Sequence, residues 1–315
     1  MVEPVVFFVI PCYNEEEALP ETSRRLKQKI TDLYQRNVIS SESRVLFVDD
    51  GSKDRTWDVI ESLHQEAAYF GGVKLAHNRG HQNALYAGLM EALKAGCDAA
   101  ISMDADLQDD IDAIDHFIEK YKQGAQVVYG VRDNRDTDSA FKRGTAEMFY
   151  KLMNALGTET VADHADYRLM GRAALEALSE YTEVNLFLRG IVPSIGFKTD
   201  VVYYKRGVRV AGESKYPLSK MISFAIEGIT SFSVKPLQMI TGFGVASVFV
   251  SIVCLIYTLV SVFTEHAVAG WGSIMISLWL IGGIIIISLG VVGEYIGKIY
   301  MESKHRPRYI VEKMI

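Results

Sequence analysis

The sequence predicts an α/β domain built on a mainly parallel sheet, followed by two membrane-spanning helices. Up to about Lys235, short apolar runs alternate with helical patterns, which is typical of βαβ units. After Pro236 the composition changes abruptly. Residues 237–263 and 271–293 contain no charged residue, and each run exceeds the roughly 20 residues that cross a bilayer as a helix. A buried core helix is the alternative, and two such runs in succession make it the weaker interpretation.

The sheet is expected from the alternation of strands and helices along the first half of the chain. Strands are predicted at 5–10, 44–48, 73–76, 99–103 and 126–131, with helices at 15–34, 56–68, 83–95 and 111–122. Polar or charged residues follow each predicted strand. Because ligands of open α/β sheets bind at the carboxyl ends of the strands, we expect the active site at this rim.

The predicted organisation has five parts. They are a catalytic domain at 1–218, an interfacial amphipathic helix at 219–235, transmembrane helices at 236–264 and 271–297, and a basic tail at 298–315. For the segment 219–235 a core helix is an equally good interpretation. The loop between the spans carries no Lys or Arg, whereas the flanking segments are basic. We therefore expect a multi-pass protein of the inner or plasma membrane, with the catalytic domain and both termini in the cytosol.

Composition narrows the choice of partners. The net charge of −6 argues against nucleic acid as the main partner, and the basic residues beside the spans suit anionic lipid headgroups.

Three scattered cysteines give no disulfide or zinc pattern. No G-x-G-x-x-G follows the first strand and no P-loop motif occurs, so dinucleotide and P-loop binding lose their main support. Glycines in both apolar runs permit close helix packing, within one chain or in a homo-oligomer.

A pair of carboxylates, Asp104 and Asp106, ends the predicted strand 99–103. In an extended strand, side chains two residues apart point to the same side. Two hard oxygen ligands suit Mg²⁺ or Mn²⁺, with water and a diphosphate completing the coordination shell. The competing interpretation is that Asp104 is a turn residue and that Asp106 caps the following helix.

Three further segments are candidates for binding or catalysis. The stretch DDGSKDRT at 49–56 can bind a base or ribose, or can simply form a turn and a helix cap. A carboxylate in the DHAD segment at 163–166 can orient an acceptor or stabilise positive charge on a sugar ring. Two basic clusters can bind the phosphates of donor and acceptor, or can be solvated surface; they contain Arg132, Arg135 and Arg143, and Arg206, Arg209 and Lys215.

Taken together, the motifs resemble family 2 glycosyltransferases of the GT-A fold. They look like the polyprenyl-phosphate glycosyltransferases of the GtrB type and dolichol-phosphate mannose synthase. The resemblance covers nearly the whole chain and rests on VIPCYNE at 9–15, DDGSKDRT at 49–56, HNRGHQ at 77–82, DADLQD at 104–109, DYRLM at 166–170, FLRG at 187–190, GESKY at 212–216, GEYIG at 293–297 and RPRY at 306–309. One departure is Asp109-Asp110, where many relatives have a proline after the glutamine.

The resemblance implies roles for individual residues. It implies that the nucleoside is bound by Pro11, Tyr13, Glu15 and Asp50, and that the metal is bound by Asp104 and Asp106. The donor pocket would be lined by Asp104, Ala105 and Gln108, and the phosphates would be bound by Arg132, Arg209 and Lys215. The catalytic carboxylate would be Asp166. The implied reaction inverts the anomeric centre and gives a β-linked sugar phosphate on a polyprenol such as undecaprenol.

The sequence leaves alternatives for the sugar donor and for the class of protein. UDP-glucose is the first candidate donor, with UDP-N-acetylglucosamine and GDP-mannose as alternatives. A processive polysaccharide synthase is disfavoured because the chain has two spans and FLRG instead of a Q-x-x-R-W segment. A non-catalytic membrane tether that binds a nucleotide is disfavoured by the presence of Asp104, Asp106 and Asp166.

Overall fold

The computed structural model describes residues 3–132, 164–184, 186–205, 235–263 and 270–315. These residues belong to two compact units. One unit contains the sheet, runs to residue 205 and also includes residues 306–315. The other contains helices α9 (Lys235–Phe263) and α10 (Trp271–Ser303).

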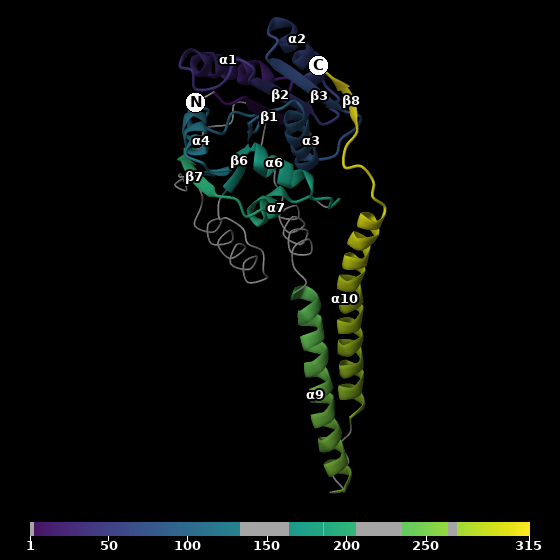
Figure 1. Ribbon diagram of the computed structural model, residues 1–315. Coiled ribbons are helices and arrows are strands. Elements are labelled where there is room, and N and C mark those ends of the chain that lie inside the picture. The colour runs from purple at the N-terminus through teal and green to yellow at the C-terminus, as the bar shows by residue number, and fades with distance from the viewer. Residues whose placement is uncertain (1–2, 133–163, 185, 206–234, 264–269) are drawn as a thin grey trace. The chain divides into compact units, whose positions relative to one another are not determined.

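The described strands form one mixed sheet in the order β7-β5-β6-β4-β1-β2-β3-β8 (Figure 1). β4, β1, β2 and β3 are parallel to one another, as predicted. β6 is antiparallel to β4 and β5, and β8 is antiparallel to β3. The strands are β1 (Val6–Cys12), β2 (Arg44–Asp49), β3 (Phe70–Leu75), β4 (Ala99–Ser102), β5 (Val127–Arg132), β6 (His164–Gly171), β7 (Thr199–Tyr204) and β8 (Val311–Met314).

Helices cover both faces of the sheet. α1 (Leu19–Gln35), α2 (Thr56–Glu66) and α4 (Ala113–Lys122) share a hydrophobic core with Phe8, Ile10 and Phe47 of the sheet. α3 (His81–Lys94) covers the opposite face, next to α6 (Arg172–Ser179). A short helix, α7 (Leu188–Ser194), follows α6. In Figure 1, α1 and α2 lie on one side of the strands and α3 and α6 on the other.

Helix α3 packs very closely on the sheet at Gly88. A Cβ atom on this residue would lie 2.4 Å from Cγ1 of Val9 and 2.6 Å from Cγ2 of Val48. Only a residue without a side chain allows this approach, because protein interiors are already close-packed. Gly88 therefore sets the height of α3 above β1 and β2, and with it the position of the residues at the start of α3.

The five strands and four helices predicted in the first half are all present, with bounds shifted by a few residues. One detail of the prediction is wrong. The strand predicted to carry Asp104 and Asp106 ends at Ser102, so the two carboxylates lie in a turn and not in an extended segment. The turn is held by the Thr22 hydroxyl, which donates to the Ala105 carbonyl at 2.6 Å, and by a left-handed Leu107 with a φ of 57°.

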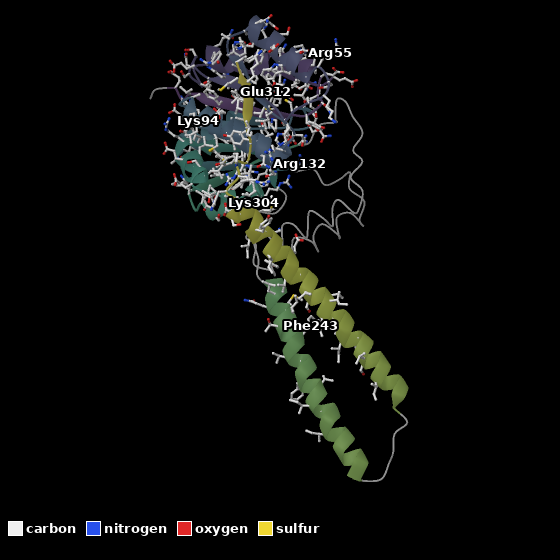
Figure 2. The ribbon with its side chains drawn as sticks, turned by 90° about the vertical axis from the view of Figure 1, so that its right-hand side faces the viewer. Arg55, Lys94, Arg132, Phe243, Lys304 and Glu312 are labelled. Atoms are coloured by element: carbon white, nitrogen blue, oxygen red, sulfur yellow. The ribbon has the colours of Figure 1, made fainter. Side chains whose placement is uncertain are left out.

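The helical unit matches the position of the predicted spans. Within the described residues, Leu280–Ser303 is long and apolar enough to cross a membrane, and Leu237–Ala246 is a shorter apolar helix. In Figure 2 the drawn side chains of α9 and α10 are almost all carbon, including Phe243. That both helices cross a membrane stays a prediction. The helix predicted at 219–235 lies outside the described residues except for Lys235, which begins α9.

Part of the predicted basic tail belongs to the sheet. α10 continues to Ser303, and residues 311–314 then form β8 at the edge of β3. Arg308 Nε donates to the Glu183 carbonyl at 2.9 Å, and its guanidinium lies 4.4 Å from the ring centroid of Tyr86 on α3. Tyr309 contacts the same ring edge-on. The sequence did not predict this strand, because the segment is short and rich in charged residues.

Candidate active site

Asp166, on β6, lies at the centre of a group of cationic and amide side chains. Nη2 of Arg168 lies 2.8 Å from its Oδ1, and Nη2 of Arg189 lies 3.1 Å from its Oδ2. Gln82 Nε2 donates to Oδ2 at 3.5 Å. Burial alone would raise the pKa of Asp166, but His81, Arg189 and Arg168 outweigh it and hold this pKa well below its usual range. These three cationic partners therefore favour the charged form of Asp166.

His81 connects this carboxylate to the end of β4. Its Nε2 lies 3.6 Å from Oδ2 of Asp166 and 3.8 Å from Oδ1 of Asp104. Burial lowers the pKa of His81, but the contacts with Asp166 and Asp104 outweigh this and raise it above its ordinary value. One carboxylate from the turn after β4 and one from β6 thus lie within 4 Å of the same ring nitrogen of His81, at the start of α3.

Asp104 lies in a strongly acidic environment. Burial is the largest cause that raises its pKa, to about 6; Asp109, Asp166 and Asp106 add to it, while His81 opposes them. Its side chain nevertheless keeps 38% of its surface exposed. A group of carboxylates that is open to solvent favours a bound cation, because the cation relieves their mutual repulsion.

The residues present fit a divalent cation that shares its ligands with a substrate. Within the described residues, no group of three or more His, Cys, Asp or Glu side chains is arranged to hold a metal ion. Mg²⁺, however, is commonly held by one or two carboxylates together with water and substrate phosphates. Asp104 and Asp106 supply that number of carboxylates, both from the turn that follows β4.

The loops after β1 and β2 are tied together by hydrogen bonds. Asn14, with a φ of 55°, donates its backbone N–H to the Ser52 hydroxyl, and its Oδ1 accepts the Lys53 N–H at 2.9 Å. The Glu15 N–H donates to Oγ1 of Thr56 at 2.8 Å. The turn considered for 49–56 is therefore present, and it fixes the loop that carries Tyr13 and Glu15, whereas α2 begins without a side-chain cap hydrogen bond.

Asp50 has a structural task in the same region. Its two carboxylate oxygens accept the backbone N–H groups of Arg79 at 2.6 Å and of Gly80 at 2.9 Å. Gly51, with a φ of 67°, lies against the backbone of His77 and Asn78. Asp50 thus holds the loop that leads into α3 and His81, whereas its predicted contact with a nucleoside stays a prediction.

The remaining predicted site residues are distributed along the rim. Pro11 is the sixth residue of β1, and Tyr13 follows the strand with 42% of its surface exposed. Ala105 is buried in the turn after β4, and the Gln108 N–H donates to Oδ1 of Asp106 at 3.1 Å. Arg143, Arg209 and Lys215 lie outside the described residues.

Arg132 lies near the site but is engaged by acidic and phenolic partners. Its Nη2 lies 3.4 Å from Oδ1 of Asp109, and its Nε lies 3.3 Å from the Tyr204 hydroxyl. The same Tyr204 hydroxyl donates to Oδ1 of Asp109 at 2.6 Å. The aspartate that follows Gln108 therefore has a clear role in this chain: it anchors Arg132 and Tyr204 to the loop that carries Asp104 and Asp106.

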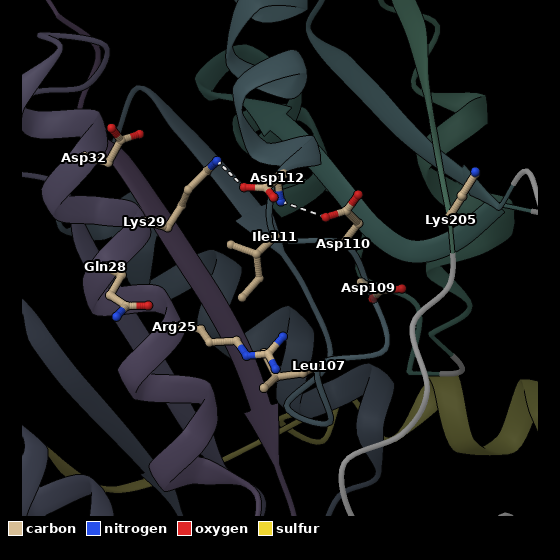
Figure 3. Close-up of a pocket in the computed structure, with 10 residues that line it drawn as sticks. All are labelled: Arg25, Gln28, Lys29, Asp32, Leu107, Asp109, Asp110, Ile111, Asp112 and Lys205. Atoms are coloured by element: carbon tan, nitrogen blue, oxygen red, sulfur yellow. Dashed lines mark hydrogen bonds and ion pairs between the residues drawn. The ribbon is translucent and has the colours of Figure 1, made fainter.

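A pocket of about 470 Å³ lies beside this loop (Figure 3). α1 contributes Arg25, Gln28, Lys29 and Asp32, and the loop contributes Leu107 and Asp109–Asp112. Lys29 is already paired with Asp112 at 2.9 Å. The lining residues include neither Asp104 nor Asp166, so the pocket does not contain the two carboxylates that were predicted to bind metal and to act in catalysis.

Sequence reasoning gave no role to four residues that surround Asp166. They are His81, Gln82, Arg168 and Arg189. A usable signal existed for Arg168, because it follows Asp166 by two residues in one strand and thus points to the same side. The others come from α3 and from the start of α7, and only the fold brings them to the site.

Comparison with known proteins identifies the class of protein. The model of the family described as Glycosyl transferase family 2 matches residues 7–179. The uncharacterized glycosyltransferase YkoT of Bacillus subtilis (strain 168) is 51% identical over 98% of this chain and 92% of its own length. A bactoprenol glucosyl transferase of Shigella phage SfV is 39% identical over 98% of each chain.

The chain therefore belongs to glycosyl transferase family 2 and is a glycosyltransferase. The family match, with the mixed and mostly parallel sheet, confirms the expected GT-A catalytic domain. Among solved structures, a mannosyltransferase from Pyrobaculum calidifontis in complex with GDP-Man and Mn²⁺ gives a TM-score of 0.44 at 16% identity, covering 80% of each chain.

Proposed function

We propose that the chain transfers a sugar from a nucleotide-sugar to the phosphate of a polyprenyl lipid. UDP-glucose and undecaprenyl phosphate are the first candidates, with UDP-N-acetylglucosamine and GDP-mannose as alternative donors. The observation that carries the proposal is the meeting of Asp104, after β4, and Asp166, on β6, at His81. The name of the phage relative, bactoprenol glucosyl transferase, supports a lipid acceptor, and the apolar segment Leu280–Ser303 supports attachment to a membrane.

The proposed reaction is a direct displacement. An oxygen of the acceptor phosphate forms a bond to the anomeric carbon while the bond from that carbon to the nucleoside diphosphate breaks. The electron pair leaves with the diphosphate, and the anomeric centre inverts to give a β-linked sugar phosphate. The acceptor phosphate is already an anion, so the reaction needs no strong base.

Asp166 suits this reaction because its low pKa makes it a poor proton acceptor and keeps it negatively charged. A fixed negative charge beside the sugar ring stabilises the positive charge that develops on the ring in the transition state. Arg168 holds the carboxylate from the protein interior, and His81 and Gln82 hold it from α3. Asp104 and Asp106 would hold Mg²⁺ or Mn²⁺, which would neutralise charge on the leaving diphosphate.

The proposed setting is the cytosolic face of the inner or plasma membrane, with α9 and α10 as a transmembrane pair and both termini in the cytosol. Charge distribution supports this orientation, because Lys and Arg flank the apolar runs and are absent between them. The acceptor phosphate is then confined to the headgroup layer, and its orientation toward the active site is fixed in advance. A homo-oligomer is compatible with the glycines in both helices.

The proposal is tested by measuring sugar transfer to undecaprenyl phosphate from a panel of radiolabelled UDP- and GDP-sugars. The full chain is assayed with Mg²⁺, with Mn²⁺ and with EDTA, beside the variants Asp104→Ala and Asp166→Ala and the control Asp115→Asn. Asp115 is an acidic residue of α4 that pairs with Lys29 and Arg36. We expect one donor to give an acid-labile lipid product that is lost in EDTA and in both site variants.

Two other results would contradict the proposal or part of it. If folded protein binds UDP but transfers no sugar from any donor, the result would contradict the proposed function and favour a non-catalytic tether or a different acceptor. If transfer persists in EDTA, the proposed role of the metal is wrong even though the reaction class stands.

A further inference from the structure

We propose that Arg189 binds the phosphate of the acceptor and that Asp166 holds Arg189 in place for this purpose. This inference rests on the proposed function, because it names the residue that receives the acceptor. The starting observation is electrostatic. Asp104, Asp106 and Asp109 come from one loop, and Nε2 of His81 lies 3.8 Å from Oδ1 of Asp104 and 3.6 Å from Oδ2 of Asp166. An anionic phosphate that approaches these carboxylates is repelled unless a cation lies on its path.

Two arginines contact Asp166, and they differ in exposure. The side chain of Arg168 is 1% exposed and points into the protein. The side chain of Arg189 is 32% exposed. Its Nη2 lies 3.1 Å from Oδ2 of Asp166, and its Nε lies 3.3 Å from Oδ1 of Asp166. A ligand can therefore reach Arg189 from solvent but cannot reach Arg168. The guanidinium plane also matches the geometry of a phosphate, which it binds through two parallel hydrogen bonds.

The backbone from which Arg189 projects is fixed to the active site. The N–H of the preceding residue, Leu188, donates to Oε1 of Gln82 at 3.1 Å. The carbonyl of Leu188 accepts a hydrogen bond from Nη1 of Arg168 at 3.3 Å. Gln82 and Arg168 also contact Asp166. The start of α7 is thus tied to the same group of side chains as the carboxylate, which holds Arg189 in a defined position before a ligand binds.

Within the described part of the chain, Arg132, which was expected to bind phosphates, and Lys29, which lines the neighbouring pocket, are each already engaged by carboxylates. Arg132 is paired with Asp109 and Tyr204. Lys29 is paired with Asp112 and Asp115. Arg189 is the cation that combines contact with Asp166, partial exposure and an anchored backbone. Asp166 therefore has a second effect on the acceptor besides its charge: it orients the guanidinium that binds the phosphate.

The test compares Arg189→Gln and Arg189→Lys with the control Arg24→Gln in the full chain. Arg24 is an exposed arginine on α1 that pairs with Glu21. Three quantities are measured: the KM for a short-chain polyprenyl phosphate, the affinity for UDP, and the rate at which the donor is hydrolysed by water without acceptor. UDP affinity and hydrolysis report on the donor site, whereas the acceptor KM reports on the acceptor site.

We expect Arg189→Gln to raise the acceptor KM by about tenfold to a hundredfold, the loss expected for a charge-assisted hydrogen bond. UDP affinity should stay within about twofold, and donor hydrolysis should change less than the acceptor KM, because Arg189 reaches the donor only through Asp166. Arg189→Lys should restore part of the acceptor binding, because lysine keeps the charge but loses the planar fork. Asp166→Asn should raise the acceptor KM as well, since it weakens the hold on Arg189.

Other results would overturn the inference. A loss of UDP affinity with an unchanged acceptor KM would place Arg189 on the donor diphosphate. Equal losses in all three quantities, without rescue by lysine, would give Arg189 a structural role only. Absence of transfer by the unmodified chain, in contrast, would contradict the proposed function itself.

Discussion

Nη2 of Arg168 lies 2.8 Å from Oδ1 of Asp166, and both side chains leave β6 on the same face. Arg168 is among the largest fully buried side chains of the described residues, and its Nε has no hydrogen-bond partner among them. A buried guanidinium is costly unless its charge is compensated. The same ion pair therefore contributes both to the stability of the sheet and to the charge state of Asp166.

Substituting Arg168 tests this link. Arg168→Gln removes the buried cation and leaves Asp166 with its partners from α3 and α7. We expect the catalytic unit to lose about 3 kcal/mol of stability, the cost of breaking a buried pair, and to melt several degrees lower. The control Arg172→Gln breaks an exposed pair with Glu176 and should change the melting temperature little. Equal melting temperatures for the two variants would contradict the prediction.

Asp50 offers a test that separates a structural role from a binding role. Asp50→Ala removes the acceptors for the Arg79 and Gly80 amides, so hydrogen exchange at both amides should become faster. The Ser52 amide, which donates to Asp49, serves as the internal control and should keep its protection. Unchanged exchange with a large loss of UDP affinity would instead support the nucleoside contact that the family resemblance implies.

The close packing of α3 leads to a prediction for Gly88. Gly88→Ala places a methyl group where Val9 and Val48 already lie, which should cost about 1–3 kcal/mol and shift α3 outward. Because His81 begins the same helix, sugar transfer should fall as well as the melting temperature. Ala95→Ser, at the exposed end of α3, is the control and should alter neither quantity. Full activity of Gly88→Ala would show that the height of α3 does not position His81.

Removal of residues 311–315 tests the contribution of β8. The deletion uncovers the backbone N–H and C=O groups at the edge of β3 and removes the pairing of Ile315 with Gly72. We expect a lower melting temperature and concentration-dependent association, since an uncovered edge strand can pair with another chain. Glu312→Gln, which breaks only an exposed pair with Lys74, should behave like the unmodified protein in size-exclusion chromatography.

The first half of the fold was predictable because each of its elements has a clear local signal. Period-two and period-3.6 patterns gave β1 to β5 and α1 to α4 nearly at their observed bounds, and the polar residues after the strands gave the rim. The later elements lack such a signal. β6 carries Asp166 and Arg168 in its interior, and β8 has exposed side chains at three of four positions. Both are strands because of their neighbours in the sheet and not because of their own composition.

The candidate site was predictable only in part. Asp104, Asp106 and Asp166 were proposed as site residues from their motifs, but their surroundings depend on contacts between residues far apart in sequence. His81 is 85 residues from Asp166, and Arg189 is 23 residues from it, as the numbering shows. Both side chains lie in motifs that carry the resemblance, HNRGHQ and FLRG, but no local pattern assigned a role to either of them. The turn after β4 was only the competing interpretation for a related reason, since the Thr22 hydroxyl that holds it comes from α1.

The position of β8 after α10 in the sequence also determines when, during synthesis, the edge of β3 can be covered. β8 pairs with β3, yet it follows α10 in the sequence, so the ribosome makes both apolar helices before it makes the strand that covers β3. Domains generally fold as they emerge, and the catalytic unit of this protein must wait with one edge of its sheet uncovered. Translation of the helical segment is therefore an interval in which the nascent chain is most exposed to wrong pairing, and the arrival of β8 ends it.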